Sequence, residues 1–246
     1  MADDTMTLPE APATLRSPDT VPYSWPWDGA FRPGRFVLLV AGAQQGMAQA
    51  SLRATAVLTG IDQLAATVRS SGGLVCWVRH ASIARDLARR HDAVLGTPHR
   101  RGGLLPVPGS AEWQWCVDPD PADVVVDAGG FDGFHDGPLD RVLRSLGSDL
   151  VGMCGLAHEV AVDSTCRSAN DRGYECLTLT DLVAPIDPDT SAHALSSVTM
   201  SGGIFGAIAP AAALVDLFTR AARWNGSSPT SESPTSENPT FEEVPT

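Results

Sequence analysis

Short apolar segments alternate with longer segments of helical periodicity through most of the chain, and this order limits the possible folds more than any other feature. Residues 36–40 (FVLLV) form a continuous apolar run, as expected of a strand covered on both faces. Further strands are predicted at residues 74–78, 124–126, 150–154 and 175–179. Helices are predicted at residues 50–70, 139–146, 160–172, 192–200 and 208–222.

The alternation of strands and helices predicts an α/β fold, a three-layer α/β/α sandwich around a mostly parallel, twisted sheet. In such a sheet, ligand sites lie at the carboxyl ends of the strands. We expect an extended N-terminal arm over residues 1–35, one α/β domain over 36–224 and a disordered acidic tail over 225–246. Closely spaced prolines preclude a helix in the arm, and the Ser/Pro/Thr-rich tail has too few apolar side chains to offset its ordering entropy.

The composition disfavours several classes of partner and location. A net charge of −12 argues against nucleic acid, because phosphate binding relies on clustered cations. No apolar run approaches the roughly 20 residues of a membrane helix, and the N-terminus lacks the order of a signal peptide, so a cytoplasmic protein without membrane contacts is expected. The five cysteines form no C-x-x-C pair and the six histidines are scattered, so no metal, disulfide framework or cofactor is expected.

All 17 basic residues are arginine, and the chain contains no lysine. Codon bias explains this composition without any functional cause. Its chemical consequence holds all the same, because a lysine Schiff base, a P-loop lysine and a catalytic lysine are all impossible in this chain.

Three sequence blocks follow one another in a characteristic order. They are residues 22–29 (PYSWPWDG) with the strand ending at 40–44 (VAGAQ), residues 164–165 (ST) with 169–177 (ANDRGYECL), and residues 202–207 (GGIFGA). Together they resemble the isochorismatase-like cysteine hydrolases, and specifically the biuret hydrolase branch, over most of residues 21–218. The resemblance implies a twisted, mostly parallel sheet between helices, hydrolysis of C–N bonds in small amides and ureas, and assembly into dimers or tetramers.

The same resemblance implies three catalytic side chains, and this chain lacks each of them. The family uses a cysteine at a helix N-terminus, a carboxylate after the first strand and a lysine after the third strand. Here Ala161, Gly42 and Ala128 occupy those three places, and Ser201 replaces the substrate-binding glutamine of the biuret branch. Losing one member of such a unit costs on the order of 10⁴ to 10⁶ in rate, so we expect the inherited mechanism to be absent.

Other side chains near the vacated positions are candidates for a pocket or for new chemistry. The pocket candidates are Gln44, Phe134, His158 and Ser201. Cys154 ends the fourth strand and is either a substitute nucleophile or a buried, inert thiol. His158 and Glu159, with Asp163, form either an acid–base group or an ordinary charged start of a helix. The Gly-rich segment 130–137 is either a functional loop or a plain turn.

Three functions are compatible with the sequence, and we rank first a catalytically degenerate subunit of a homo- or hetero-oligomer. Its partner would be a second copy or an active paralogue, and Trp25 and Trp27 would be interface anchors unless the arm folds back on its own domain. The second is a C–N amidohydrolase with a rebuilt site that uses Cys154 or a water activated by His158 and Glu159. The third is a small-molecule binding protein whose enlarged, neutral pocket favours a ligand less polar than biuret. A small amide or urea-like molecule is also expected as a ligand.

Overall fold

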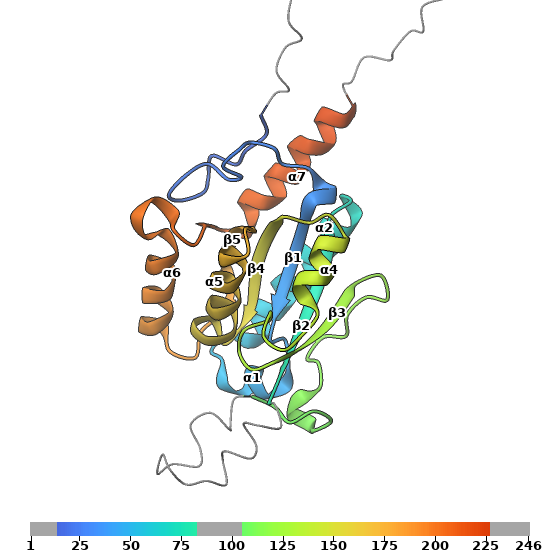
Figure 1. Cartoon of the computed structure of the whole chain (residues 1–246), viewed down its shortest axis with the longest axis vertical. Coiled ribbons are helices and arrows are strands. Elements are labelled where there is room, and N and C mark those ends of the chain that lie inside the picture. The colour runs from blue at the N-terminus through green and yellow to red at the C-terminus, as the bar shows by residue number, and fades with distance from the viewer. Residues whose placement is uncertain (1–13, 83–104, 227–246) are drawn as a thin grey trace, which may run out of the picture.

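Six parallel strands form one sheet at the centre of the molecule (Figure 1). The computed structural model describes residues 14–82 and 105–226. The strands are β1 (Phe36–Ala41), β2 (Leu74–Ala81), β3 (Val124–Gly129), β4 (Leu150–Leu156), β5 (Glu175–Ala184) and β6 (Ala207–Ala209). They lie in the order β3-β2-β1-β4-β5-β6, and every neighbouring pair is parallel. The α/β class predicted from the sequence is confirmed.

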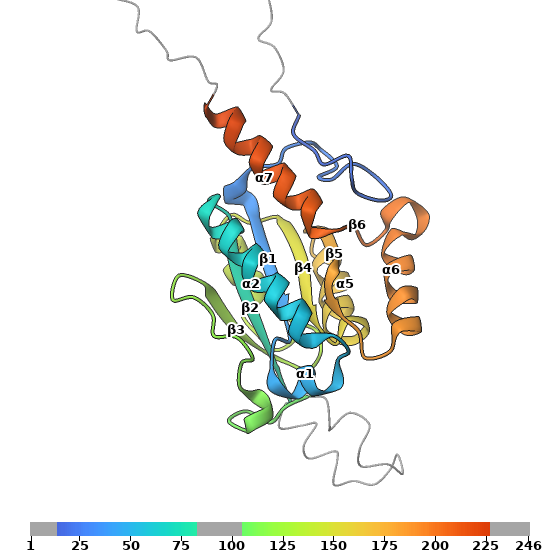
Figure 2. The same ribbon diagram turned by 180° about the vertical axis from the view of Figure 1, so that it is seen from behind.

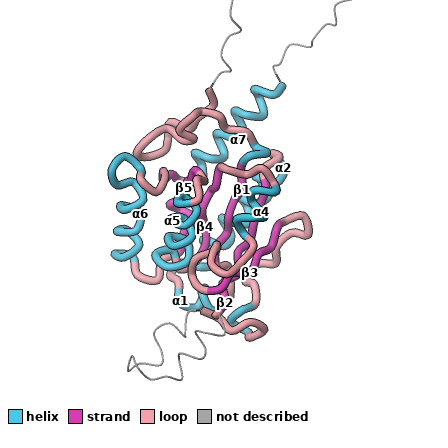
Figure 3. The backbone as a smooth tube through the Cα atoms, in the orientation of Figure 1, coloured by secondary structure: helices cyan, strands magenta, loops and turns pink. Residues whose placement is uncertain are grey.

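Helices cover both faces of this sheet and complete three layers, as the tube in Figure 3 also shows. The helices are α1 (Gln45–Ala50), α2 (Ala54–Ser70), α4 (Leu139–Ser145), α5 (Asp163–Asp171), α6 (Pro188–Gly203) and α7 (Ala211–Gly226). Figure 1 shows α4 and α5 in front of the sheet, and Figure 2 shows α2 and α7 on the other face. Within residues 14–82 and 105–226, no helix is long and apolar enough to cross a membrane.

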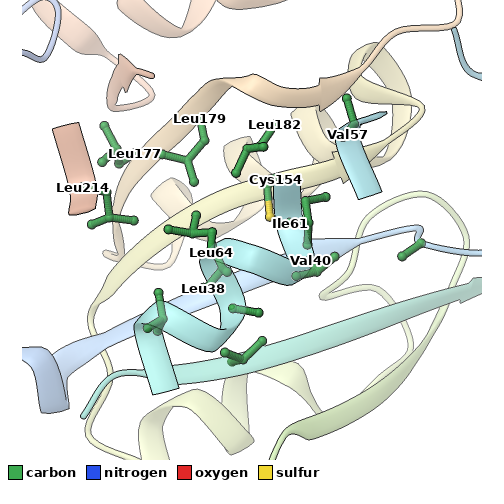
Figure 4. Close-up of a cluster of buried hydrophobic side chains, with 14 of the residues drawn as sticks. Leu38, Val40, Val57, Ile61, Leu64, Cys154, Leu177, Leu179, Leu182 and Leu214 are labelled. Atoms are coloured by element: carbon green, nitrogen blue, oxygen red, sulfur yellow. The ribbon is translucent and has the colours of Figure 1, made fainter. Parts of the chain in front are cut away.

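The central position of strand β1 in the sheet explains why its sequence is apolar without interruption. It pairs with β2 on one side and β4 on the other, and all six of its residues are buried. Leu38 and Val40 face the layer of α2 and α7, where Figure 4 shows them near Leu64. Val37 and Leu39 face the opposite core, which includes residues of α4 and α5. Side chains alternate between the faces of a strand, so two buried faces require an unbroken apolar run.

Two predicted helices have different boundaries in the structure. The helix predicted over 50–70 begins instead at Ala54 as α2, because Arg53 adopts a left-handed conformation with φ of 59°, and Ala50 ends the separate helix α1. The helix predicted from residue 208 begins instead at Ala211, because Ile208 belongs to β6. There Ile208 exchanges two backbone hydrogen bonds with Val21 of the arm, at 3.0 and 2.8 Å. Segments 1–13 and 227–246 of the predicted arm and tail, and the segment 83–104, lie outside the described residues.

The arm is attached to the domain by a buried tryptophan. Trp25 is fully buried, and its ring lies 6.2 Å from that of Phe31 and 6.1 Å from that of Phe36. Phe36 continues this aromatic cluster to Phe218 of α7, with ring centroids 5.3 Å apart. Trp25 therefore belongs to the core of its own chain and cannot anchor a partner, whereas Trp27 is 67% exposed.

Substitution of the two arm tryptophans should affect stability to different extents. Trp25→Ala should lower the free energy of unfolding by about 3 to 5 kcal/mol, because it empties the centre of the aromatic cluster. Trp27→Ala is the matched control and should change stability by less than about 0.5 kcal/mol, because its side chain is mostly in solvent. Urea unfolding of the full chain measures both values. Equal losses in the two variants would contradict the attachment of the arm through Trp25.

Candidate functional site

The three positions at which the family resemblance implies catalytic side chains lie at one edge of the sheet. Gly42 directly follows β1, Ala128 lies near the end of β3, and Ala161 lies in the helical segment that follows β4. Strands β3, β2, β1 and β4 are consecutive in the sheet and parallel, so their carboxyl ends meet at the edge that carries α1 in Figure 1. Ala128 is 2% exposed and Ala161 is fully buried. The fold therefore brings the three positions to one edge of the sheet, where the residues present are one glycine and two alanines.

A methionine side chain fills the space beside Gly42. Gly42 has a φ of +69°, and a Cβ added to it would collide with the sulfur of Met47 on α1. Met47 is fully buried, so the thioether belongs to the core. The expectation of an enlarged cavity is wrong at this position, because packing has replaced the missing carboxylate.

The segment that would carry the nucleophile is a π-helical turn, His158–Val162, that continues into α5. It begins after Ala157, which adopts a left-handed conformation with φ of 50°. The Ala161 amide donates a hydrogen bond of 2.8 Å to the Ala157 carbonyl, and the Ala161 carbonyl accepts one of 2.7 Å from Thr165 Oγ1. The backbone at Ala161 is thus held by hydrogen bonds, while its methyl side chain offers no nucleophile or base.

The loop that follows β3 packs back onto Ala128. The Gly129 amide donates to the His135 carbonyl at 2.9 Å, and a Cβ at Gly137 would come within 2.7 Å of the Asp127 carbonyl oxygen. Asp132 accepts hydrogen bonds of 2.8 Å from the Phe134 amide and from Ser168 Oγ. These contacts use the Asp132 carboxylate to hold the loop against α5. The segment 130–137 is therefore a tightly packed turn.

Gln44 joins the ends of two strands through its side-chain amide. Its Oε1 accepts a hydrogen bond of 2.7 Å from the His80 amide, and its Nε2 donates one of 3.0 Å to the His80 carbonyl. Gln44 is fully buried. Both ends of this amide are used on the backbone, so Gln44 fixes β1 to β2.

His80 is a residue of this edge that the sequence analysis did not single out. It is fully buried in register with Ala128, and its Nδ1 lies 3.1 Å from the Gly130 carbonyl oxygen. A carbonyl can only accept, so Nδ1 carries the proton and Nε2 carries the lone pair. That Nε2 is buried and has no hydrogen-bond partner among residues 14–82 and 105–226. Burial lowers the pKa of His80 to about 4, against smaller opposing effects of the Gly130 carbonyl and of Asp132.

The candidate replacement nucleophile, Cys154, lies inside the core. Its side chain is fully buried, and Figure 4 shows it among Ile61, Leu64 and Leu182. Its thiol donates to the Leu39 carbonyl at 3.7 Å, and burial raises the pKa of the thiol well above its usual range. A thiol must ionise to attack a carbonyl, so Cys154 is poorly suited to catalysis.

His158 and Glu159 connect the π-helical turn to the start of α6. His158 Nδ1 lies 2.6 Å from Ser191 Oγ, and burial lowers the pKa of this imidazole. The Glu159 carboxylate accepts hydrogen bonds from the Ile186 and Asp187 amides, at 3.0 and 2.6 Å. Asp163 pairs instead with Arg167, at 2.9 Å. These side chains hold backbone segments together and do not converge into an acid–base group.

Two pocket candidates lie away from the vacated site. Phe134 stacks on Tyr174 with ring centroids 5.8 Å apart, and the Arg172 guanidinium lies 4.8 Å from its ring. Ser201 is exposed at the end of α6, which runs back along the sheet from the carboxyl ends of the strands toward the opposite end (Figure 2). Ser201 therefore does not line the vacated site of its own chain, and the expectation that it does is wrong. Among residues 14–82 and 105–226, no three His, Cys, Asp or Glu side chains are grouped to hold a metal ion.

Comparison with known proteins identifies the family. Residues 36–210 match the isochorismatase domain, and the chain belongs to this family. Streptothricin hydrolase of Streptomyces noursei is 29% identical over 202 residues, which cover 81% of this chain and 68% of that protein. A ureidoacrylate amidohydrolase RutB of Methylorubrum extorquens is 27% identical over 154 residues, which cover 54% of this chain and 58% of that protein.

Solved structures agree with this fold. A cysteine hydrolase from Pseudomonas syringae superposes with a TM-score of 0.61 at 20% identity, covering 86% of this chain and 100% of the other. The pyrazinamidase of Pyrococcus horikoshii in complex with zinc superposes with a TM-score of 0.59 at 22% identity, covering 72% and 98%. The narrower resemblance to the biuret hydrolase branch stays a prediction.

The buried imidazole of His80 predicts a loss of stability in acid. Its pKa lies near 4 in the folded chain and near 6.5 in the unfolded chain, so between these values the unfolded chain binds the extra proton. Stability should therefore fall as the pH is lowered from 6.5, by about 3 kcal/mol at pH 4 from this residue. Urea unfolding at several pH values measures the slope.

The matched variants for this prediction are His80→Asn and His193→Asn, where His193 is exposed on α6. Only the first should flatten the dependence of stability on pH between 4 and 6.5, whatever its effect at neutral pH. An unchanged slope in His80→Asn would show that His80 does not titrate in this way.

Proposed function

We propose that this chain is a catalytically inactive member of the isochorismatase family that acts as a structural or regulatory subunit of a homo- or hetero-oligomer. The observation that carries the proposal is the identity of three residues at the carboxyl edge of the sheet. Gly42, Ala128 and Ala161 stand where the family resemblance implies a carboxylate, a lysine and a cysteine. The partner would be a second copy or an active paralogue.

Each step of the implied hydrolysis requires a group that these positions do not have. Attack on an amide carbon needs a thiolate, and departure of the amine needs an acid that returns the proton. Alanine and glycine supply neither, and no lysine occurs anywhere in the 246 residues. Removing a single member of such a unit already costs on the order of 10⁴ to 10⁶ in rate, so the loss of three supports inactivity.

The candidate replacement groups Cys154, His158 and Glu159 also support inactivity, because their structural contacts account for them. Cys154 is enclosed by the core, His158 is bound to Ser191, and Glu159 accepts from the two amides at the start of α6. A rebuilt hydrolase would need at least one of these groups to face a substrate. Each is instead committed to packing or to a backbone contact.

Oligomer formation is supported by the edge of the sheet as well as by the family resemblance. Strand β3 ends the strand order of the sheet, and Val125 on this strand is 46% exposed. An edge strand presents backbone donors and acceptors that can pair with another chain. This edge is a suitable place for contact between subunits.

The full chain should not hydrolyse a panel of small amides and ureas that includes biuret, and it should have a molar mass at least twice that of one chain by light scattering. An active family hydrolase is the positive control for turnover. Cys154→Ala and His158→Gln should leave the absence of turnover unchanged. Turnover that disappears in either variant would establish a rebuilt active site, and a strictly monomeric mass with no co-assembling paralogue would contradict the subunit role.

The same panel tests whether the vacated site holds a ligand. His80 Nε2 is a buried acceptor without a partner, so an amide or urea N–H is the group that it would bind. A ligand that binds the folded chain raises the unfolding temperature. A rise that is lost in His80→Asn would assign the ligand to this edge and make binding, rather than assembly, the primary function.

A further inference from the structure

A shallow hollow of about 490 Å³ opens at the end of the sheet opposite Gly42 and Ala161. Its walls come from the arm, from the turn between α5 and β5, and from the end of α6, which lie together in Figures 1 and 2. This volume lies within the range of small-molecule sites. Of its lining residues the sequence analysis named only Trp27, as an interface anchor, and none belongs to the vacated catalytic site.

Two aromatic rings of the arm form one wall of the hollow. Tyr23 and Trp27 pack edge to face, with ring centroids 5.4 Å apart and planes at 82°. Trp27 remains 67% exposed although it lines the hollow. Gly203 has a φ of +98°, and a Cβ there would lie 2.7 Å from the Tyr23 ring, so glycine allows the end of α6 to approach the arm this closely. Trp25, buried two residues before Trp27, holds the arm in place.

A carboxylate lies beside these rings. Glu175 lines the hollow at the start of β5, is partly buried, and accepts a hydrogen bond from the Trp27 amide. Burial raises the pKa of Glu175, and Asp28 and Asp149 add to this rise, against the lowering effects of the Trp27 amide and of Arg35. The nearby cation, Arg35, pairs through Nε and Nη2 with Asp149, and its Nη1 donates to the Ala30 carbonyl at 3.0 Å. Asp28, Asp149 and Glu175 therefore share the single Arg35 guanidinium on the arm side of the hollow, whereas the Arg144 guanidinium lies 5.4 Å from the Tyr174 ring on another wall.

We propose that this hollow is a binding site for an organic cation, an ammonium or guanidinium group on a short apolar body. The faces of Trp and Tyr rings attract cations, and more strongly where the cation leaves water. A carboxylate beside them adds charge attraction and is itself stabilised by a positive partner. Such a group could come from a free amine or from an arginine side chain presented by a polypeptide. The inference does not depend on the proposed subunit role, because it uses neither turnover nor assembly.

Choline and 3,3-dimethyl-1-butanol test the charge requirement, because they have the same shape and differ in the positive charge. Ligand-observed NMR titration of the full chain should show choline binding at least about tenfold more tightly than the alcohol. Acetyl-arginine-amide in the same titration distinguishes the source, since tighter binding than choline would indicate a polypeptide arginine and weaker binding a free amine. Equal binding of choline and the alcohol, or no binding of any cation, would overturn the proposal.

Variants locate the binding. Glu175→Gln and Trp27→Ala should each weaken cation binding by about tenfold, and Trp27→Phe should retain part of the affinity. Asp62→Asn removes the same charge from an exposed position on α2 and is the matched control, with no expected change. Unfolding curves confirm that each variant is folded. Cation binding unchanged in both Glu175→Gln and Trp27→Ala would place it outside this hollow and overturn the proposal.

Discussion

Enclosure of β1 is the constraint on which the rest of the molecule depends. This strand is paired along both edges and buried on both faces, and it therefore fixes the positions of β2 and β4 and of the helices that cover them. The carboxyl ends of the three strands then meet at one place. That place is set by apolar packing and backbone pairing, so it persists whichever side chains follow the strands. A family fold can therefore be retained when the catalytic residues of the family are absent.

Contacts at this edge occupy the space that the catalytic side chains implied by the family resemblance would need. Met47 lies where a side chain at position 42 would be, and the 130–137 loop packs onto Ala128. Active sites commonly cost stability, because they hold polar groups in unfavourable surroundings. Among the described residues, His80 Nε2 and Asp163 Oδ1 retain that character at this edge, because both atoms are buried without a hydrogen-bond partner. The remaining polar groups, such as Gln44 and Glu159, stabilise the turns at this edge.

The sequence predicted β1, β2, β4 and β5 because each is buried enough to require apolar residues, and it predicted the half-exposed β3 from its three consecutive valines, but it did not predict β6. Three residues of alanine and isoleucine give no strand signal, and β6 exists because β5 and the arm pair with it. The vacated positions could be placed because each follows a strand or begins the next helix. Ser201 could not, because the direction of α6 carries it to the opposite end of the sheet. The Trp27 hollow needs the arm folded onto the domain, which no local pattern encodes.

Alkylation of the folded chain with iodoacetamide at neutral pH, read residue by residue by mass spectrometry, tests whether Cys154 has become an activated nucleophile. If Cys154 has not replaced the missing nucleophile, the partly exposed Cys116, whose amide donates to the Ala43 carbonyl, should be modified first because of its exposure, and Cys154 should react only as the chain unfolds. Modification of Cys154 in the folded chain at a rate equal to or above that of Cys116 would reveal an activated nucleophile and contradict the proposed inactivity of this chain.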